Sequence, residues 1–284
     1  MPGAVIHSAY DLSAVPPKPT TGNWARFVCI SDTHEHVFPV PDGDVLLHSG
    51  DLTSTGTLGG TKITMDWLCS LPHPQKVIIA GNHDLTFHRD WYETAFYGWH
   101  REKENTSRVM EHVTGTKARN AGVVYLENGL HELQTRPNGR KWTVYGSPWT
   151  PEFFSWAFNY DRGQEARKII SSFSKADILL THGPPHGILD RVTSGMSVGC
   201  ESLLARLPEL RPRLHVFGHI HEAHGVQIGE WVPPTPTSQS NEQSVFVNAA
   251  NWPAGSRSRG KDGRAVSFGS GEFQPIIVDL LEDL

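Results

Sequence analysis

Five short apolar runs in this chain each end abruptly in glycine and polar residues. They are RFVCISDTH, DVLLHSGD, KVIIAGNHD, DILLTHG and LHVFGHIH. Each run has the length of a buried strand, and each leads into a loop rich in aspartate, asparagine or histidine. Helical patterns lie between several of the runs, and strands that alternate with helices favour an α/β architecture. The runs therefore predict an α/β sheet with chemically active loops at its edge.

The segments between these runs show helical periodicity. Three of them predict a buried stripe, formed by Ile63, Trp67 and Leu71, by Ala166, Ile169, Ile170 and Phe173, and by Leu203, Leu204 and Leu207. Pro208 should discourage continuation of the third helix, because proline lacks the backbone N–H. The later runs KWTVYG, SVFVNAA and QPIIVDL are typical of strands without helices between them. They indicate a second sheet or antiparallel additions to the first.

The length of 284 residues, with 38% hydrophobic residues, favours one large domain. Residues 1–24 are rich in proline and patternless, and we expect an extended N-terminal arm there. Residues 25–284 then form the domain. Two stretches, 101–120 and 233–243, have the composition of surface insertions.

Charge and targeting signals narrow the class of protein. The net charge of −5 gives no overall basic field, so a nucleic-acid partner is disfavoured. The three cysteines are far apart in the sequence, and we expect each to be a small buried apolar residue and not part of a disulfide. This pattern favours a reducing compartment. The sequence has no secretory signal and no membrane-length apolar window, so we expect a soluble, cytoplasmic protein without a membrane partner. The sequence leaves the oligomeric state open.

The loops that follow the five runs share one chemistry. They contain Asp32, His34, Asp51, Asn82, His83, Asp84, His182, His219 and His221. Carboxylate, imidazole and amide ligands without a thiolate suit divalent transition metals. Each motif alone has an ordinary structural explanation, and GNHD can be a simple β-turn. Five strands that all end in metal-ligating residues are harder to explain in that way, because the carboxyl ends of neighbouring strands meet at one edge of a sheet.

The ordered motifs Asp-x-His, Gly-Asp, Gly-Asn-His-Asp, Thr-His-Gly and Gly-His-x-His resemble those of the calcineurin-like metallophosphoesterases. The strings PDGDVLLHSGDLT, IAGNHDLTF, YGSPWTP, WAFN, THGPP and VFGHIHE are similar to the metallophosphoesterase-domain-containing, or MPPED-like, branch. The resemblance implies a single-domain, four-layer α/β/β/α sandwich of two mixed sheets.

The resemblance also implies a centre of two divalent metal ions. The ligands are compatible with Mn, Fe, Zn, Co or Ni. One ion would be held by Asp32, His34, Asp51 and His221, and the other by Asp51, Asn82, His182 and His219. Asp51 would bridge the two ions, since a carboxylate has two oxygens. Two such ions can activate water for attack on a phosphoryl group.

The remaining residues implied by the resemblance act on substrate. His83 would contact the phosphoryl group or protonate the leaving oxygen, and Asp84 would orient His83. Asn82 would also contact the substrate. Among the extra histidines His36 is the best candidate for a substrate contact, and Trp149 is the candidate from the aromatic-rich segment 145–163. Most aromatic residues of that segment should belong to the core.

The loop after Asp51 bears on the kind of ester. Serine/threonine protein phosphatases of this superfamily carry Gly-Asp-x-x-Asp-Arg-Gly, whereas this chain has GDLTSTG. Without that arginine a doubly charged phosphomonoester has less charge compensation. A small phosphodiester, which carries one negative charge, is therefore favoured, and the resemblance to the MPPED-like branch also implies phosphodiester or nucleotide substrates, including cyclic nucleotides. The alternatives are a nucleotide-binding protein of low turnover on the same fold, a phosphomonoesterase and a nuclease.

Overall fold

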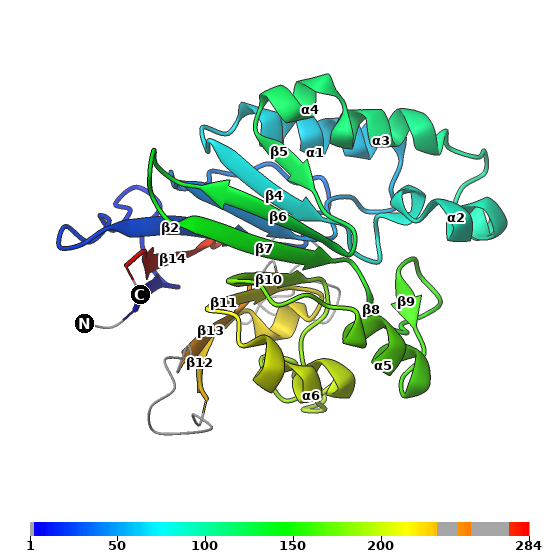
Figure 1. Ribbon diagram of the computed structural model, residues 1–284. Coiled ribbons are helices and arrows are strands. Elements are labelled where there is room, and N and C mark those ends of the chain that lie inside the picture. The colour runs from blue at the N-terminus through cyan, green and yellow to red at the C-terminus, as the bar shows by residue number, and fades with distance from the viewer. Residues whose placement is uncertain (1–2, 232–242, 251–272, 284) are drawn as a thin grey trace.

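The computed structural model describes residues 3–231, 243–250 and 273–283, and the strands within them form two mixed sheets (Figure 1). The first sheet has the order β1 (Ala4–His7), β14 (Ile276–Leu281), β2 (Trp24–Ile30), β3 (Val45–Ser49), β4 (Gln75–Ile79) and β5 (Val123–Tyr125). The second has the order β12 (Gly225–Glu230), β13 (Gln243–Asn248), β11 (Leu214–Phe217), β10 (Ile178–Thr181), β7 (Lys141–Ser147) and β6 (Gly129–Gln134). A short parallel pair, β8 (Thr150–Pro151) and β9 (Asn159–Tyr160), lies apart from both sheets.

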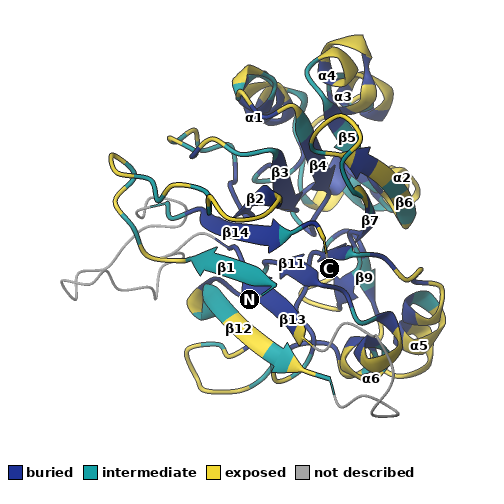
Figure 2. Ribbon diagram, turned by 60° about the vertical axis from the view of Figure 1, so that its left-hand side comes forward, coloured by how far each residue is buried: buried dark blue, intermediate teal, exposed yellow. Residues whose placement is uncertain are grey.

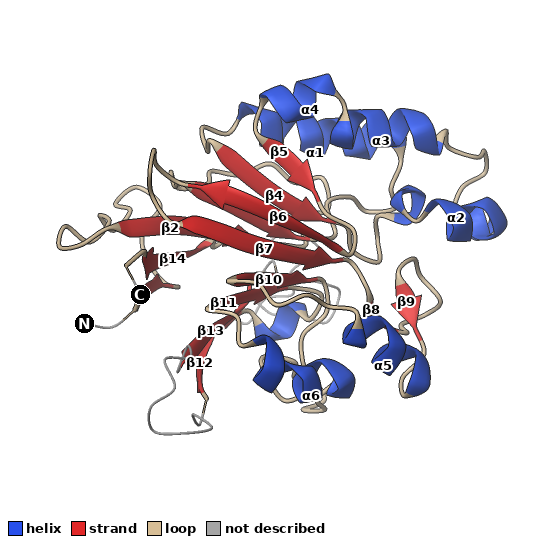
Figure 3. Cartoon of the chain, in the orientation of Figure 1, coloured by secondary structure: helices blue, strands red, loops and turns tan. Residues whose placement is uncertain are grey.

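Parallel strands run through the middle of each sheet. Strands β2 to β5 are parallel to one another, and β14 pairs antiparallel with β2. In the second sheet β7, β10, β11 and β13 are parallel, and β6 and β12 are the antiparallel edges. In Figure 3 the arrowheads of β4, β7 and β10 point toward the same edge of the molecule. The loops at the carboxyl ends of both sheets are thereby brought together.

The two sheets pack against each other through their inner faces, and helices cover the outer face of each sheet (Figures 1 and 3). Helices α1 (Leu58–Ser70), α3 (Thr106–Thr114) and α4 (Thr116–Asn120) lie over the first sheet, and α5 (Gln164–Ser171) and α6 (Glu201–Leu210) lie over the second. The short helix α2 (Arg89–Ala95) follows β4, and single 3-10 turns lie at Leu85–Phe87, Phe96–Gly98 and His221–Ala223. The α/β/β/α sandwich implied by the sequence is confirmed.

Three apolar layers follow from the alternation of side chains along the strands. Phe27 of β2 points into the layer between the sheets, whereas its neighbour Val28 packs against the helices over the first sheet. On the other sheet Leu180 faces the central layer and Leu179 faces α5 and α6. Figure 2 shows buried strands at the centre and exposed outer faces on the helices. Such double burial explains why the strands read as continuous apolar runs.

Helix α1 buries part of the stripe that the spacing predicts, since Trp67 is buried and Leu71 is partly buried. Ile63 is 51% exposed, and the buried face carries Thr61, Thr64, Met65 and Leu68 instead. Burial of Thr64 is tolerated because its hydroxyl donates to the Leu52 carbonyl at 2.9 Å. A polar residue satisfied in this way is invisible to a search for apolar periodicity, so this prediction was wrong at Ile63.

The two helices over the second sheet follow the predicted periodicity more closely. Ala166, Ile170 and Phe173 are buried beside α5 as expected. Helix α6 buries Leu203 and Leu207 but leaves Leu204 39% exposed. It also continues through Pro208 to Leu210, which corrects the expected stop. The proline lies in the last turn, where one missing N–H costs a single hydrogen bond.

The segments expected as an arm and as insertions contribute to the layers. Within residues 1–24, Ala4–His7 form the edge strand β1, which pairs antiparallel with β14. Residues 101–120 contain α3 and α4, which bury Val109, Val113 and Ala118. The stretch 233–243 lies outside the described residues, apart from Gln243 at the start of β13.

Candidate metal centre

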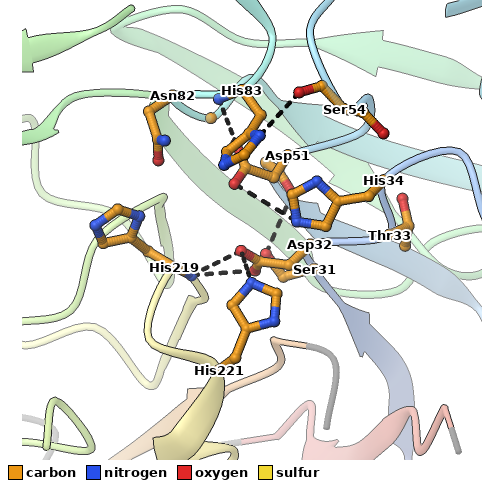
Figure 4. Close-up of polar contacts among 12 residues, drawn as sticks. Ser31, Asp32, Thr33, His34, Asp51, Ser54, Asn82, His83, His219 and His221 are labelled. Atoms are coloured by element: carbon orange, nitrogen blue, oxygen red, sulfur yellow. Dashed lines mark hydrogen bonds and ion pairs between the residues drawn. The ribbon is translucent and has the colours of Figure 1, made fainter. Parts of the chain in front are cut away.

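The loops that follow β2, β3, β4, β10 and β11 bring the predicted ligands to one edge of the sandwich (Figure 4). Four of the ligands have left-handed backbone conformations, which side chains other than glycine rarely adopt: φ is 53° at Asp32, 45° at His34, 53° at Asp51 and 67° at His219. Backbone strain of this kind collects at functional sites, where the surrounding structure holds it in place. The clustering therefore marks this edge as the candidate site.

The first predicted ligand set is compact and buried. Ligand atoms of Asp32, His34 and His221 all lie within 4.8 Å of one another. The Nε2 atom of His221 is 3.1 Å from the Asp32 carboxylate. The Nε2 atom of His34 is 3.9 Å from Oδ2 of Asp51. The mixed oxygen and nitrogen donors of this set fit a divalent transition metal.

The second set meets the first at Asp51. The Nε2 atom of His182 is 3.4 Å from Oδ2 of Asp51 and 2.8 Å from Oδ1 of Asn82. Asp32, Asp51 and His182 also offer ligand atoms that lie within 4.8 Å of one another. The His219 ring lies 5.0 Å from that of His182, and its backbone N–H donates to both Asp32 oxygens at 3.1 Å. The structure thus brings all seven predicted ligands together, while their coordination of a metal stays a prediction.

Backbone carbonyls from the end of β3 and from the loop that follows it orient three of the histidines. The Nδ1 atoms of His182, His34 and His83 contact the carbonyls of Ser49 at 2.9 Å, Thr53 at 3.3 Å and Ser54 at 2.9 Å, respectively. A carbonyl can only accept, so each Nδ1 donates a proton to it and each Nε2 is the ring nitrogen left to face the site. Second contacts of this type are usual around metal-ligating histidines. These contacts could not be predicted from the sequence, because every residue has a backbone carbonyl whatever its side chain.

Asp84 accepts four hydrogen bonds from the loops around the site. They come from the backbone N–H groups of Leu52 at 3.1 Å, Thr53 at 2.9 Å and Gly81 at 2.9 Å, and from the Thr53 hydroxyl at 2.7 Å. Burial and the negative charge of Asp51 raise the pKa of Asp84 to about 7. The contact that orients the His83 ring comes from the Ser54 carbonyl rather than from Asp84. Asp84 instead ties the Gly81 turn to the loop that carries Asp51.

Burial and opposite charges work against each other at the centre. Burial alone would lower the pKa of His182, but the carboxylates of Asp51 and Asp32 raise it to about 9. Burial alone would raise the pKa of Asp51, but His182, His83 and His34 hold it well below the usual value. The carboxylates therefore need positive charge beside them, which protonated imidazole or a divalent cation can supply.

Two glycines allow the loops to approach the carboxylates closely. A Cβ atom at Gly218 would overlap the Asp32 carboxylate and the Ser31 hydroxyl, and one at Gly81 would overlap the Asp51 carboxylate. The motifs therefore need glycine at these positions for steric reasons.

The two further candidates for substrate contacts have the following surroundings. The Nδ1 atom of His36 donates to the carbonyls of Thr33 at 3.2 Å and His34 at 3.0 Å, and its ring is 5.7 Å from that of Phe273. The Trp149 ring packs 5.2 Å from His88, within the apolar layer over the first sheet. Trp149 is partly buried and also packs against the layer over the second sheet, and its contact with substrate stays a prediction.

Two other aromatic residues contact the site histidines. The Trp156 ring lies 4.0 Å from that of His83, and the Phe153 ring lies edge-on to that of His219 at 5.6 Å. Both belong to the aromatic-rich segment 145–163, which was the only sequence signal for them. Composition could not show which ring of the segment faces the site.

Comparisons with known proteins agree with this geometry. The family model described as "Calcineurin-like phosphoesterase" matches residues 22–223. Metallophosphoesterase domain-containing protein 1 of Homo sapiens is 41% identical over 219 residues, or 74% of this chain and 64% of that protein. UPF0046 protein C25E10.12 of Caenorhabditis elegans is 35% identical over 245 residues, or 82% of this chain and 77% of that protein.

Among solved structures, TT1561 of Thermus thermophilus has a similar fold, with a TM-score of 0.50 and 10% identity over 81% of this chain and 90% of that chain. The chain spans about two thirds, 64%, of the length of the human relative. No helix in the described part of the chain is long and apolar enough to cross a membrane.

Proposed function

Since the chain belongs to the calcineurin-like phosphoesterase family and to its metallophosphoesterase-domain-containing branch, we propose that it is a metal-dependent phosphoesterase that hydrolyses phosphodiesters. The observation that carries the proposal is the convergence of two carboxylates, one amide and four imidazoles at one edge of the sandwich. In hydrolysis a bond forms between a water oxygen and phosphorus, and the bond from phosphorus to the leaving oxygen breaks.

The two ligand sets would hold a pair of divalent ions with Asp51 between them. Such ions lower the pKa of water and offset the negative charge of a phosphoryl group. The chain's own contribution is to fix the ligands in place. Ser49 and Thr53 hold the His182 and His34 rings through their carbonyls, and Asp84 fixes the turn that carries Asp51.

In this proposal His83 acts on the leaving oxygen. Its Nδ1 proton is donated to the Ser54 carbonyl, so Nε2 is the atom that can carry and release a further proton. Its backbone N–H donates to Oδ1 of Asp51 at 2.8 Å, and its ring lies 4.7 Å from that of His34. These contacts hold the imidazole next to the first ligand set. Transfer of the Nε2 proton to the leaving oxygen would avoid release of an alkoxide.

The preference for a diester rests on the charges near Asp51. The positive groups that lower the pKa of Asp51 most strongly are the imidazoles of His182 and His83. Ser54 and Thr55 occupy the positions where the related monoesterases carry an aspartate and an arginine. A guanidinium at that place would clamp a dianion in bidentate fashion. A monoanionic diester needs less of this compensation, and cyclic nucleotides belong to that class.

A matrix of metals and substrates tests the proposal. We expect hydrolysis of bis(p-nitrophenyl) phosphate to exceed that of p-nitrophenyl phosphate in protein loaded with Mn, Fe, Co, Ni or Zn, and to cease after chelation. The variant His83→Ala should lose roughly 10²- to 10⁴-fold in kcat and keep the metal content measured by elemental analysis. Asp51→Asn should lose bound metal as well as activity.

The partly buried His112 on α3 gives the control variant His112→Ala, which should behave as the wild type. A strong preference for the monoester would refute the diesterase assignment and leave a phosphoesterase. Tight binding of nucleoside monophosphates without turnover in any metal would instead favour the nucleotide-binding alternative. Digestion of single-stranded DNA would favour a nuclease.

A further inference from the structure

The loop between β8 and β9 places aromatic rings against His83, which lies beside the first ligand set, and against His219 of the second. Trp156 lies 4.0 Å from His83 and is backed by Trp99, also at 4.0 Å. Phe153 approaches His219 at 5.6 Å and contacts Phe154 at 4.6 Å. The loop therefore borders the candidate centre at two places.

The two phenylalanines are unusually exposed for such large apolar side chains. Phe153 is 49% exposed and Phe154 is 76% exposed, whereas Trp156 is partly covered by its neighbours. We call Phe153 and Phe154 the aromatic rim. Exposed apolar groups beside a polar site are typical of ligand contacts, since a pocket combines apolar walls with a few polar groups that orient the ligand.

The backbone of the loop supports a functional role. Phe154, Ser155 and Phe158 have φ angles of 53°, 54° and 52°, and left-handed conformations are rare for bulky residues. Hydrogen bonds hold this conformation from both sides. The Phe153 N–H donates to Oδ1 of Asn159 at 3.1 Å, and the Ser155 N–H donates to Oε1 of Glu152 at 2.9 Å. The rim is thus held exposed by specific contacts.

The position of the rim distinguishes the two groups of a diester. His83, which is proposed to act on the leaving oxygen, lies with His34, and their rings are 4.7 Å apart. His219 lies with His182 in the other ligand set, at 5.0 Å. The rim adjoins His219. A substrate whose leaving oxygen faces His83 would therefore direct its second ester group, which stays on phosphorus, toward the rim.

We propose that Phe153 and Phe154 bind a planar aromatic group, a nucleobase or an aryl ring, on the part of the phosphodiester that is retained in the product. The proposal rests on the proposed function for the direction of the substrate. Aromatic side chains stack on bases and aryl rings through their faces and edges. The chain would therefore prefer diesters with an aromatic retained group over those with a small alkyl group.

Two substrates with the same leaving group test the rim: bis(p-nitrophenyl) phosphate and methyl p-nitrophenyl phosphate. In the metal-loaded protein, combining Phe153→Ala with Phe154→Asn should lower kcat/KM for the bis-aryl ester by roughly tenfold or more, mainly through KM. The methyl ester should change by about twofold at most, since it has no ring to lose. Asparagine tolerates the left-handed conformation at position 154, which keeps the loop intact.

Two controls separate loss of stacking from loss of structure. Tyrosine at both positions keeps the rings and should preserve the preference for the bis-aryl ester. Leu130→Ala removes an apolar side chain of similar exposure, 54%, from β6 and should change neither substrate. Equal losses for both esters in the rim variant, or no loss for either, would overturn the proposal.

If the protein hydrolyses neither ester, the proposed function is refuted. The aromatic rim is then tested by the binding of a nucleotide. The measurement is then calorimetric titration of the metal-loaded wild type and rim variant with adenosine monophosphate. Affinity that falls roughly tenfold in the variant would support the rim. Equal affinities, or no binding to the wild type, would refute it.

Discussion

Replacement of Asp84 by asparagine tests whether this carboxylate ties together the loops that carry Asp51 and Asn82. One Asp84 oxygen accepts from the Thr53 N–H and hydroxyl, and the other accepts from the N–H groups of Leu52 and Gly81. The amide of asparagine must turn its NH₂ group toward one of these pairs. In either orientation the NH₂ group, which is itself a donor, faces buried groups that also donate.

The two orientations do not cost the same. With the NH₂ group toward Thr53, the hydroxyl can rotate to accept, so one backbone N–H loses its partner. With the NH₂ group toward Leu52 and Gly81, the backbone N–H groups of both residues lose their acceptor. The cheaper orientation leaves one buried donor unsatisfied, at a cost of about 1–3 kcal/mol in the free energy of unfolding, and the neutral amide offsets part of that cost by removing the repulsion from Asp51 that raises the pKa of Asp84.

The assay is urea denaturation at pH 8, above the pKa of about 7 of Asp84, so that the wild-type side chain is ionised. Thr53→Ser keeps the hydroxyl and should cost only about 1 kcal/mol, for the buried methyl group that it removes. Metal affinity should fall roughly 10- to 100-fold in Asp84→Asn, because the turn that carries Asp51 loses its support. A variant as stable as the wild type, with unchanged metal affinity, would show that the four bonds do not fix the site.

Two further predictions concern the core. His215 is fully buried and contacts the Thr181 hydroxyl at 2.9 Å, and burial lowers its pKa to about 3. The unfolded state then takes up the proton first as the pH falls below about 6.5, so the wild type should lose about 2 kcal/mol between pH 7 and pH 5 relative to His215→Gln. If the free energy of unfolding changed equally with pH in the wild type and His215→Gln, the prediction would be wrong. Arg26 pairs in bidentate fashion with the buried Asp279 at 2.8 Å, and Arg26→Ala should cost about 3–5 kcal/mol in urea denaturation because it leaves the carboxylate unpaired. Adding Asp279→Leu should recover much of this loss, and failure to do so would indicate that the packing of the arginine side chain matters more than its charge.

The strands and the place of the site were predictable because both depend on features that sequence records directly. A strand buried on both faces must be continuously apolar, as Phe27, Val28 and Cys29 of β2 are. The polar loops after such strands must then emerge at the edge of the sheet, which is where Asp32 and Asp51 meet. These predictions needed only the period of the side chains and the direction of the strands.

The details that failed depend on contacts between distant segments. Ile63 and Thr64 could not be assigned to the correct face of α1, since burial of the threonine depends on the Leu52 carbonyl. The contact of Trp156 with His83 could not be read from composition, because it joins segments far apart in the sequence, whereas the role of Trp149 stays a prediction. Local sequence does not contain the distant partner.

The carbonyls that hold His34, His83 and His182 have a consequence for how this centre can be altered by mutation. Substitution at Ser49, Thr53 or Ser54 changes the side chain and leaves the carbonyl in place. Alanine scanning would therefore pass over the groups that set the tautomers of three site histidines. Insertion or deletion of a single residue between Ser49, the last residue of β3, and Thr53 would shift the Thr53 and Ser54 carbonyls together. The loop thus tolerates changes of composition far better than changes of length.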